Sequence, residues 1–155
     1  MASIEFIAAI IGIALIFDFL NGANDAANSI STVVSTRVLR PRFAVAWAAF
    51  FNFVAFGIFG VKVAETIGKG IVSPTFVNEF VVLAALLSAV FWTAISTKVG
   101  MPISVSHSLV GGLVGAAFFA AGAEAIQFSG FFLTVIFIVI APLLGMTIGF
   151  FFMSL

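Results

Sequence analysis

The residues of this chain that could do chemistry lie in two polar clusters within otherwise apolar sequence. The first cluster runs from Asp18 to Ser35, and its oxygen-bearing side chains recur at intervals of three and four residues. On a helix this spacing places them on one face. The members of this stripe are Asp18, Asn21, Asp25, Asn28, Thr32 and Ser35, with Asn24 nearby. Their carboxylate, amide and hydroxyl oxygens are suitable ligands for a small, hard cation.

Helix packing is the alternative interpretation for part of this stripe. Polar side chains in a membrane also join helices by hydrogen bonds of ~1 kcal/mol or less each, and this role is favoured for Asn21 or Ser35 taken alone. It does not suffice for Asp25, because an ionised carboxylate in a bilayer needs a cationic partner. No basic residue lies within eight positions of Asp25. Gly22 and the alanines around it could also let the helix unwind and offer carbonyl oxygens to the same ion.

The second polar cluster follows Lys98 and the helix-starting Pro102. A helix from about residue 102 or 103 to 119 would hold the cluster in its first turns, where free N–H groups and the helix dipole bind anions. The cluster consists of Ser104, Ser106, His107 and Ser108. Two interpretations stay open here: an anion site at membrane depth, or serines that cap a helix at the interface. A lone His can likewise bind an oxyanion or only pack.

The composition indicates that both clusters belong to an integral membrane protein. Hydrophobic residues make up 63% of the chain, charged residues 8%, and the mean hydropathy is +1.34. Five continuous apolar segments, about 4–20, 43–61, 80–97, 103–121 and 131–153, approach the ~20 residues of a spanning helix. They do not alternate as strands do. We expect one all-α membrane domain over 1–155, with about five transmembrane or re-entrant segments, packed closely at the glycine pairs 111/115 and 145/149.

Charge placement predicts the orientation of the segments. The first short loop carries Arg37, Arg40 and Arg42 without an acid, and such loops stay cytoplasmic. The N-terminus and the balanced loop with Lys62, Glu65, Lys69 and Glu79 would then lie outside, and Lys98 inside. The chain ends at Leu155 directly after an apolar run, which is typical of a sequence cut short. We expect a multi-pass protein of the inner or plasma membrane.

Composition also excludes several classes of function. A formal net charge of zero without a basic stripe argues against nucleic-acid binding. The chain has no Cys and one His, so it offers no metal-ligand cluster and no activated nucleophile. An enzyme is therefore not expected, and neither is a cofactor. A cation stripe beside an anion-binding helix start instead indicates an anion carried together with cations, since each charge lowers the cost of desolvating the other.

Two segments carry a resemblance to a known family. Residues 22–29, Gly-Ala-Asn-Asp-Ala-Ala-Asn-Ser, resemble the GANDxANS signature of the inorganic phosphate transporter (PiT) family. Residues 100–108, Gly-Met-Pro-Ile-Ser-Val-Ser-His-Ser, resemble its second signature, G-x-P-[IV]-S-x-[ST]-H. Residues 62–71 are also similar to an outer loop of family members. Both signatures occur once and in order, as in the N-terminal half of a member.

The resemblance implies a secondary active transporter of inorganic phosphate, a symporter driven by Na⁺ or H⁺ and built from two inverted halves. It makes Asp25 and Asn28 cation ligands (for Na⁺ where sodium drives transport), with Asn24 beside them and Asn21 and Asp18 on the same stripe. It places phosphate at a re-entrant hairpin lined by Ser104, Ser106, His107 and Ser108. The partners would be phosphate, the coupling ion, the bilayer and a second inverted repeat or partner chain, with a homodimer as one form. A cation channel and a structural subunit of a membrane assembly are the alternatives.

Overall fold

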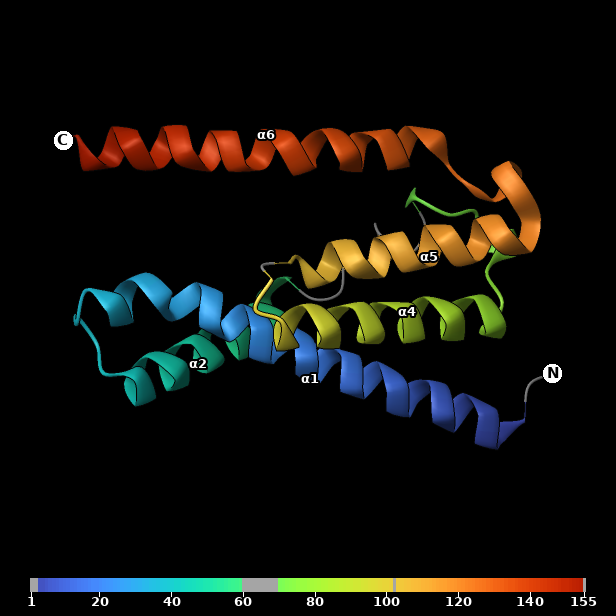
Figure 1. The fold of residues 1–155 in the computed structure, drawn as a ribbon, viewed down its shortest axis with the longest axis horizontal. Helices are drawn as coiled ribbons and strands as arrows, with labels where there is room; N and C mark the ends of the chain where they lie inside the picture. Colours follow the sequence, from blue (N-terminus) through green and yellow to red (C-terminus); the bar gives the residue numbers. More distant parts are fainter. Residues whose placement is uncertain (1–2, 60–69, 102, 155) are drawn as a thin grey trace.

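The structure is a computed structural model that describes residues 3–59, 70–101 and 103–154. The side chain of residue 59 is not described. Those residues form helices joined by short connections and contain no strand longer than an isolated bridge (Figure 1). The elements are α1 (Ile4–Ser35), α2 (Pro41–Phe59), η1 (Pro74–Phe76), α4 (Glu79–Lys98), α5 (Val105–Ala121), η2 (Gly122–Ala125) and α6 (Phe128–Met153). Within the described ranges, 5 helices are long and apolar enough to cross a membrane. The expected all-α membrane fold is confirmed.

Helix α1 joins the apolar segment 4–20 and the polar stripe 18–35 in one element. It has 32 residues and is therefore ~48 Å long, so it continues through the whole polar stripe beyond the apolar segment 4–20. Ser3 caps its start by accepting a hydrogen bond from the backbone N–H of Phe6 at 3.2 Å. The helix passes through Gly22 without a break. The suggested unwinding at Gly22 is therefore wrong for this structure, where the carbonyls of this region stay in the helix.

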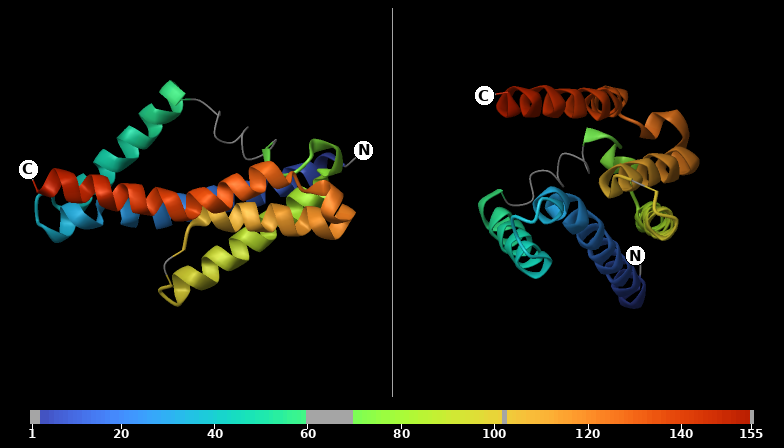
Figure 2. Two further views of the ribbon diagram at one scale, coloured as in Figure 1. Left: turned by 90° about the horizontal axis from the view of Figure 1, so that it is seen from above. Right: turned by 60° about the vertical axis from the view of Figure 1, so that its left-hand side comes forward.

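The helices alternate in direction along the chain (Figures 1 and 2). Helix α2 turns back along α1 after a connection in which Arg37 adopts a positive φ of 59°. Helices α4 and α5 form an antiparallel hairpin, and α4 runs in the same direction as α1 (Figure 1). Helix α6 lies on the α5 side of the hairpin, and α2 lies on the α1 side (Figure 2). The N-terminal ends of α1 and α4 thus share one side of the molecule, and the assignment of that side to the outside stays a prediction. Lys62, Glu65 and Lys69 of the predicted outer loop lie outside the described residues.

Two small cores hold these helices together. One joins α1, α4 and the start of α5 through Phe17, Leu86, Ala89 and Val105. The other lies at the opposite end of the hairpin and contains Ile71, Val72, Val81, Val110, Ala117, Ala125 and Ile126. There, residues 70–73 run beside 125–127, with an antiparallel bridge between Val72 and Ile126. The two cores fix both ends of the α4–α5 hairpin.

A close backbone contact between α4 and α5 lies at a glycine that the small-residue pattern did not single out. A Cβ added to Gly112 would lie 2.7 Å from the carbonyl oxygen of Ala85, so α4 and α5 touch backbone to backbone there. Gly111, Gly115, Gly145 and Gly149 have no atom within 4 Å of such a Cβ. The prediction of close packing at the pairs 111/115 and 145/149 is therefore wrong in this structure, because α5 presents the face of Gly112 to α4.

Candidate functional site

The start of α5 is built by the second polar cluster. Helix α5 begins at Val105, and Ser104 caps it by accepting a hydrogen bond from the backbone N–H of His107 at 3.4 Å. The hydroxyl of Ser108 donates to the carbonyl oxygen of Ser104 at 3.1 Å. The predicted helix start at 102 or 103 is thus a few residues early. Pro102 lies outside the described residues.

Three of the four predicted anion-binding side chains share one cavity. It has a volume of about 490 Å³ and lies between α4 and α5. Its lining includes Ser104, His107 and Ser108, together with Ser88 and Trp92 of α4. Ser106 is exposed and is not among the residues that line this cavity. Free N–H groups of a helix start, the Ser104 hydroxyl and His107 are donors that can bind an oxyanion, and the Ser108 hydroxyl can join them by turning away from the Ser104 carbonyl.

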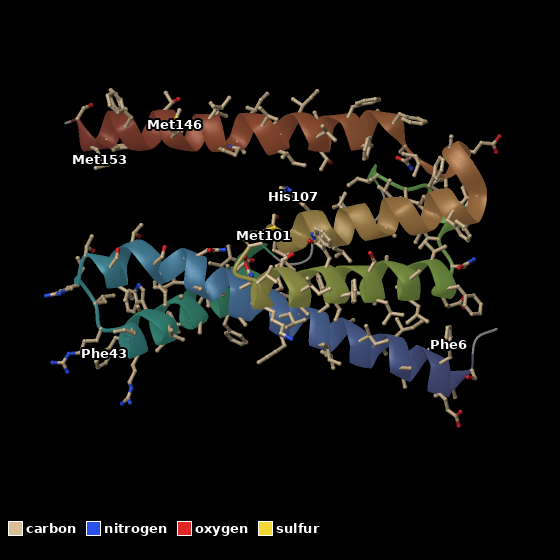
Figure 3. The ribbon with its side chains drawn as sticks, viewed as in Figure 1. Phe6, Phe43, Met101, His107, Met146 and Met153 are labelled. Carbon is tan, nitrogen blue, oxygen red and sulfur yellow. The ribbon has the colours of Figure 1, made fainter. Side chains whose placement is uncertain are left out.

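The depth of this site follows from a second cavity, between α5 and α6. Its lining consists of His107 and, from α6, Leu133, Thr134, Phe137, Ile138, Ala141 and Pro142. These α6 residues surround the middle of a 26-residue helix that has no charged residue. Such a helix is ~39 Å long and exceeds the ~30 Å hydrocarbon core. The start of α5, where His107 points toward α6 (Figure 3), therefore lies at the level of the middle of a membrane-spanning helix.

The tip of the hairpin is placed at the same depth by its contact with α1. The amide Nδ2 of Asn24 donates to Thr97 Oγ1 at 3.3 Å, near the C-terminal end of α4. Asn24 precedes Ser35, the last residue of α1, by eleven positions or ~16 Å. The hairpin tip thus stops well short of the end of α1 (Figure 1). Lys98, the last residue of α4, therefore lies away from the level at which α1 ends, so the expected position of Lys98 at the inner surface is wrong for this structure.

The first polar cluster divides between two faces of α1. Asn21 and Asn24 are half-buried on the side of Phe17, which packs in the core shared with α4. Asn28 continues this face, because its Nδ2 donates to Asn24 Oδ1 at 3.4 Å. The stripe members Asp18, Asp25, Thr32 and Ser35, like Asn28, are exposed. The helix was predicted correctly, but amides rather than carboxylates make the contact with α4.

Helix α4 supplies polar residues that the sequence interpretation missed. Thr93 and Ser96 are both 0% exposed, and Thr97 bonds to Asn24. Ser88 lines the cavity at the α5 start. The available signal was the spacing of Thr93, Ser96 and Thr97, which places three hydroxyls within about one turn of an otherwise apolar helix. Among the described residues, no group of three or more His, Asp or Glu side chains could hold a metal ion.

Comparison with known proteins finds phosphate transporters that are similar to this chain over most of its length. The model of the phosphate transporter family (PHO4) matches residues 21–155. A probable low-affinity inorganic phosphate transporter of Rhizobium meliloti (strain 1021) is 51% identical over 140 residues, which are 90% of this chain and 42% of that protein. One from Bacillus subtilis (strain 168) is 45% identical over 139 residues, covering 88% of this chain and 41% of that protein.

A solved structure agrees with these relatives. The protein in that structure, named "The sodium-dependent phosphate transporter", superposes with a TM-score of 0.88 at 37% identity, covering 96% of this chain and 38% of that one. The chain therefore spans about two fifths of the length of each of these three proteins. The relatives are named as transporters, not enzymes, which confirms the expectation from composition. This integral, multi-pass membrane chain belongs to the phosphate transporter family.

Proposed function

We propose that this chain is one repeat of a transporter that carries inorganic phosphate across the inner or plasma membrane. Phosphate binds at the start of α5, where Ser104, His107 and Ser108 line the cavity against α4. The observation that carries the proposal is the position of His107 beside the middle of α6. A polar helix start has no structural need to lie at the middle of the bilayer, whereas transporters use such half-helix ends to bind anionic substrates.

We further propose symport with a cation, and favour Na⁺ over H⁺. Asp25 and Asn28 provide oxygen ligands, with Asn24, Asn21 and Asp18 on the same helix. Support comes from the Asn28–Asn24–Thr97 hydrogen bonds, which connect this helix to the hairpin that presents the anion site. The solved neighbour is named as sodium-dependent, and this supports the choice of ion. A cation bound here lowers the cost of bringing phosphate into the membrane.

A second repeat, on the same or a partner chain, completes the transporter in this proposal. The large hydrophobic side chains of α2 and α6 are exposed along these helices, and α6 buries none of its residues. Lipid and a second inverted repeat would cover these surfaces, and rocking of one repeat against the other would open the site to alternate sides. The N-terminus lies outside, because the arginine-bearing connection between α1 and α2 stays in the cytoplasm.

Uptake by the complete two-repeat protein in liposomes tests the proposed function. We expect saturable uptake of radioactive phosphate that requires a cation gradient, and at least a tenfold rise in the KM for phosphate in Ser108→Ala. Thr147→Ala is the matched control, because this exposed α6 hydroxyl bonds only to its own helix, at Leu143. Phosphate-independent ion flux would support the channel alternative. Unchanged uptake kinetics in Ser108→Ala would contradict the proposed phosphate site.

A further inference from the structure

Three buried oxygen atoms on α1 and α4 lack a hydrogen-bond partner within the described residues. They are Asn21 Oδ1, Thr93 Oγ1 and Ser96 Oγ. Thr93 and Ser96 are 0% exposed, and Asn21 is half-buried. A buried polar group without a partner costs ~1–3 kcal/mol. The cost of three such groups requires an explanation.

The two hydroxyls differ from other helical hydroxyls of this chain. Thr36, Thr134 and Thr147 each donate to a carbonyl oxygen four residues earlier in their own chain segment, at 2.7, 2.9 and 2.8 Å. That local bond is the usual way for a Ser or Thr side chain in an apolar helix to satisfy its donor. Thr93 and Ser96 make no such bond, so their oxygens remain available to another group.

The register of α1 and α4 brings Asn21 and Thr93 to about one level, with Ser96 on the next turn. Phe17 packs in one cluster with Leu86 and Ala89, and Asn24 bonds to Thr97. Since both helices run in the same direction and rise equally per residue, Asn21 lies between these two contacts, at the level of Thr93. Ser96 is one turn further along the same face of α4. Val105, the first residue of α5, belongs to the same core cluster as Phe17.

We propose that Asn21, Thr93 and Ser96 bind a dehydrated monovalent cation, Na⁺, in addition to the cation assigned to Asp25 and Asn28. The inference rests on the proposed function and adds to it an uncharged ligand set on α4. Amide and hydroxyl oxygens are hard ligands without net charge, which suits a monovalent ion; divalent ions are held mainly through carboxylates. The C-terminal end of α4 adds the negative end of its dipole, and transporters use such ends to bind Na⁺.

This site has a consequence for the choice of coupling ion and for phosphate. None of the three ligands titrates near neutral pH, so protons cannot replace Na⁺ there. The ion would hold α1 against the end of α4, close to Ser104 and the anion cavity. Occupation by Na⁺ therefore orders the hairpin tip before phosphate binds, and loss of these ligands weakens both events.

Sodium titrations of the purified two-repeat protein test this inference. Trp92 is adjacent to Thr93 and half exposed, at 50%, so its fluorescence offers a local readout, with Na⁺ added against choline at constant ionic strength. We expect the half-saturating Na⁺ concentration to rise at least tenfold in Thr93→Val and in Ser96→Ala, with recovery in Thr93→Ser. Thr147→Val should match the wild type, because its hydroxyl lies on the exposed side of α6.

The outcomes separate the inference from the proposed function. Unchanged Na⁺ half-saturation in folded Thr93→Val and Ser96→Ala would overturn the inference, and so would higher thermal stability without a change in Na⁺ response, which indicates packing alone. Phosphate uptake by the same preparations would then still support the proposed function. If Thr93→Val does not fold, Ser96→Ala decides the matter. Wild-type protein that responds to Na⁺ but does not transport phosphate would contradict only the proposed function.

Discussion

Replacing Gly112 by alanine should damage both the stability of the α4–α5 hairpin and phosphate binding. The added Cβ would lie 2.7 Å from the carbonyl oxygen of Ala85 and 3.4 Å from two further backbone atoms of that residue. A backbone carbonyl in the middle of a helix cannot turn aside as a flexible side chain can. The two helices must therefore move apart by several tenths of an ångström.

The expected cost can be bounded from two opposing terms. Overpacking of a tight contact destabilises by ~1–3 kcal/mol, while alanine in place of glycine favours the helix by ~0.5–1 kcal/mol. The net loss is then up to ~2.5 kcal/mol of unfolding free energy. Gly112 also lines the cavity with Ser104, His107 and Ser108. A displaced helix changes the spacing of these groups, so the KM for phosphate should rise severalfold.

Thermal unfolding of the complete protein in detergent, together with phosphate uptake in liposomes, measures the two effects. Gly115→Ala is the matched control, since it is on the same helix and its Cβ would meet no atom within 4 Å. That control should be neutral or slightly stabilised, with unchanged uptake. If Gly112→Ala were as stable and as active as Gly115→Ala, then α4 and α5 would not be in backbone contact, and the cavity would not lie between them as described.

Three further predictions concern other parts of the chain. Asp25→Asn should abolish cation-driven phosphate uptake by the two-repeat protein, and undiminished uptake would reject its assignment as a cation ligand. Gly130→Ala should lower the melting temperature more than Gly145→Ala, because a Cβ at Gly130 would collide with the carbonyl oxygen of Gly70 and separate the paired connections; equal melting temperatures would show that these connections do not touch. A cysteine introduced at Arg40, in a chain without native Cys, should react with a membrane-impermeant reagent only from the cytoplasmic side; labelling from outside would reverse the topology.

The helices and their membrane character could be predicted because a single property, continuous hydrophobicity, determines them. The segments 80–97 and 103–121 lie within two or three residues of α4 and α5. Hydropathy alone ends the first segment near residue 20, because the polar stripe lowers the hydropathy of 21–35 without changing its helical spacing. The three- and four-residue spacing of the polar side chains, rather than hydropathy, predicts that the helix continues through residues 21–35.

The residues of the proposed anion site could be placed in part from the sequence. A helix start rich in serine was visible in the sequence, and the structure brings Ser104, His107 and Ser108 into one cavity. That Ser106 lies elsewhere, and that Ser88 joins them, depends on how α5 is rotated against α4. This rotation is set by the close contact at Gly112, a tertiary feature that helical spacing alone does not specify.

The cation stripe shows why a shared helix face is not yet a shared site. The polar residues of 18–35 follow one helical stripe, but successive residues on a helix are turned by ~100°, so Asn24, which lies beside the stripe, and Asp25, which is on it, point in clearly different directions. Helix α4 packs against the face of α1 that carries the amides, where Asn24 donates to Thr97, and the carboxylates of Asp18 and Asp25 stay exposed. An ionised carboxylate on an exposed face of a membrane repeat needs a cation or a polar surface of another repeat against it. In the proposed arrangement one cation neutralises Asp25 at the boundary of the repeat, and a second cation binds the uncharged oxygens inside it.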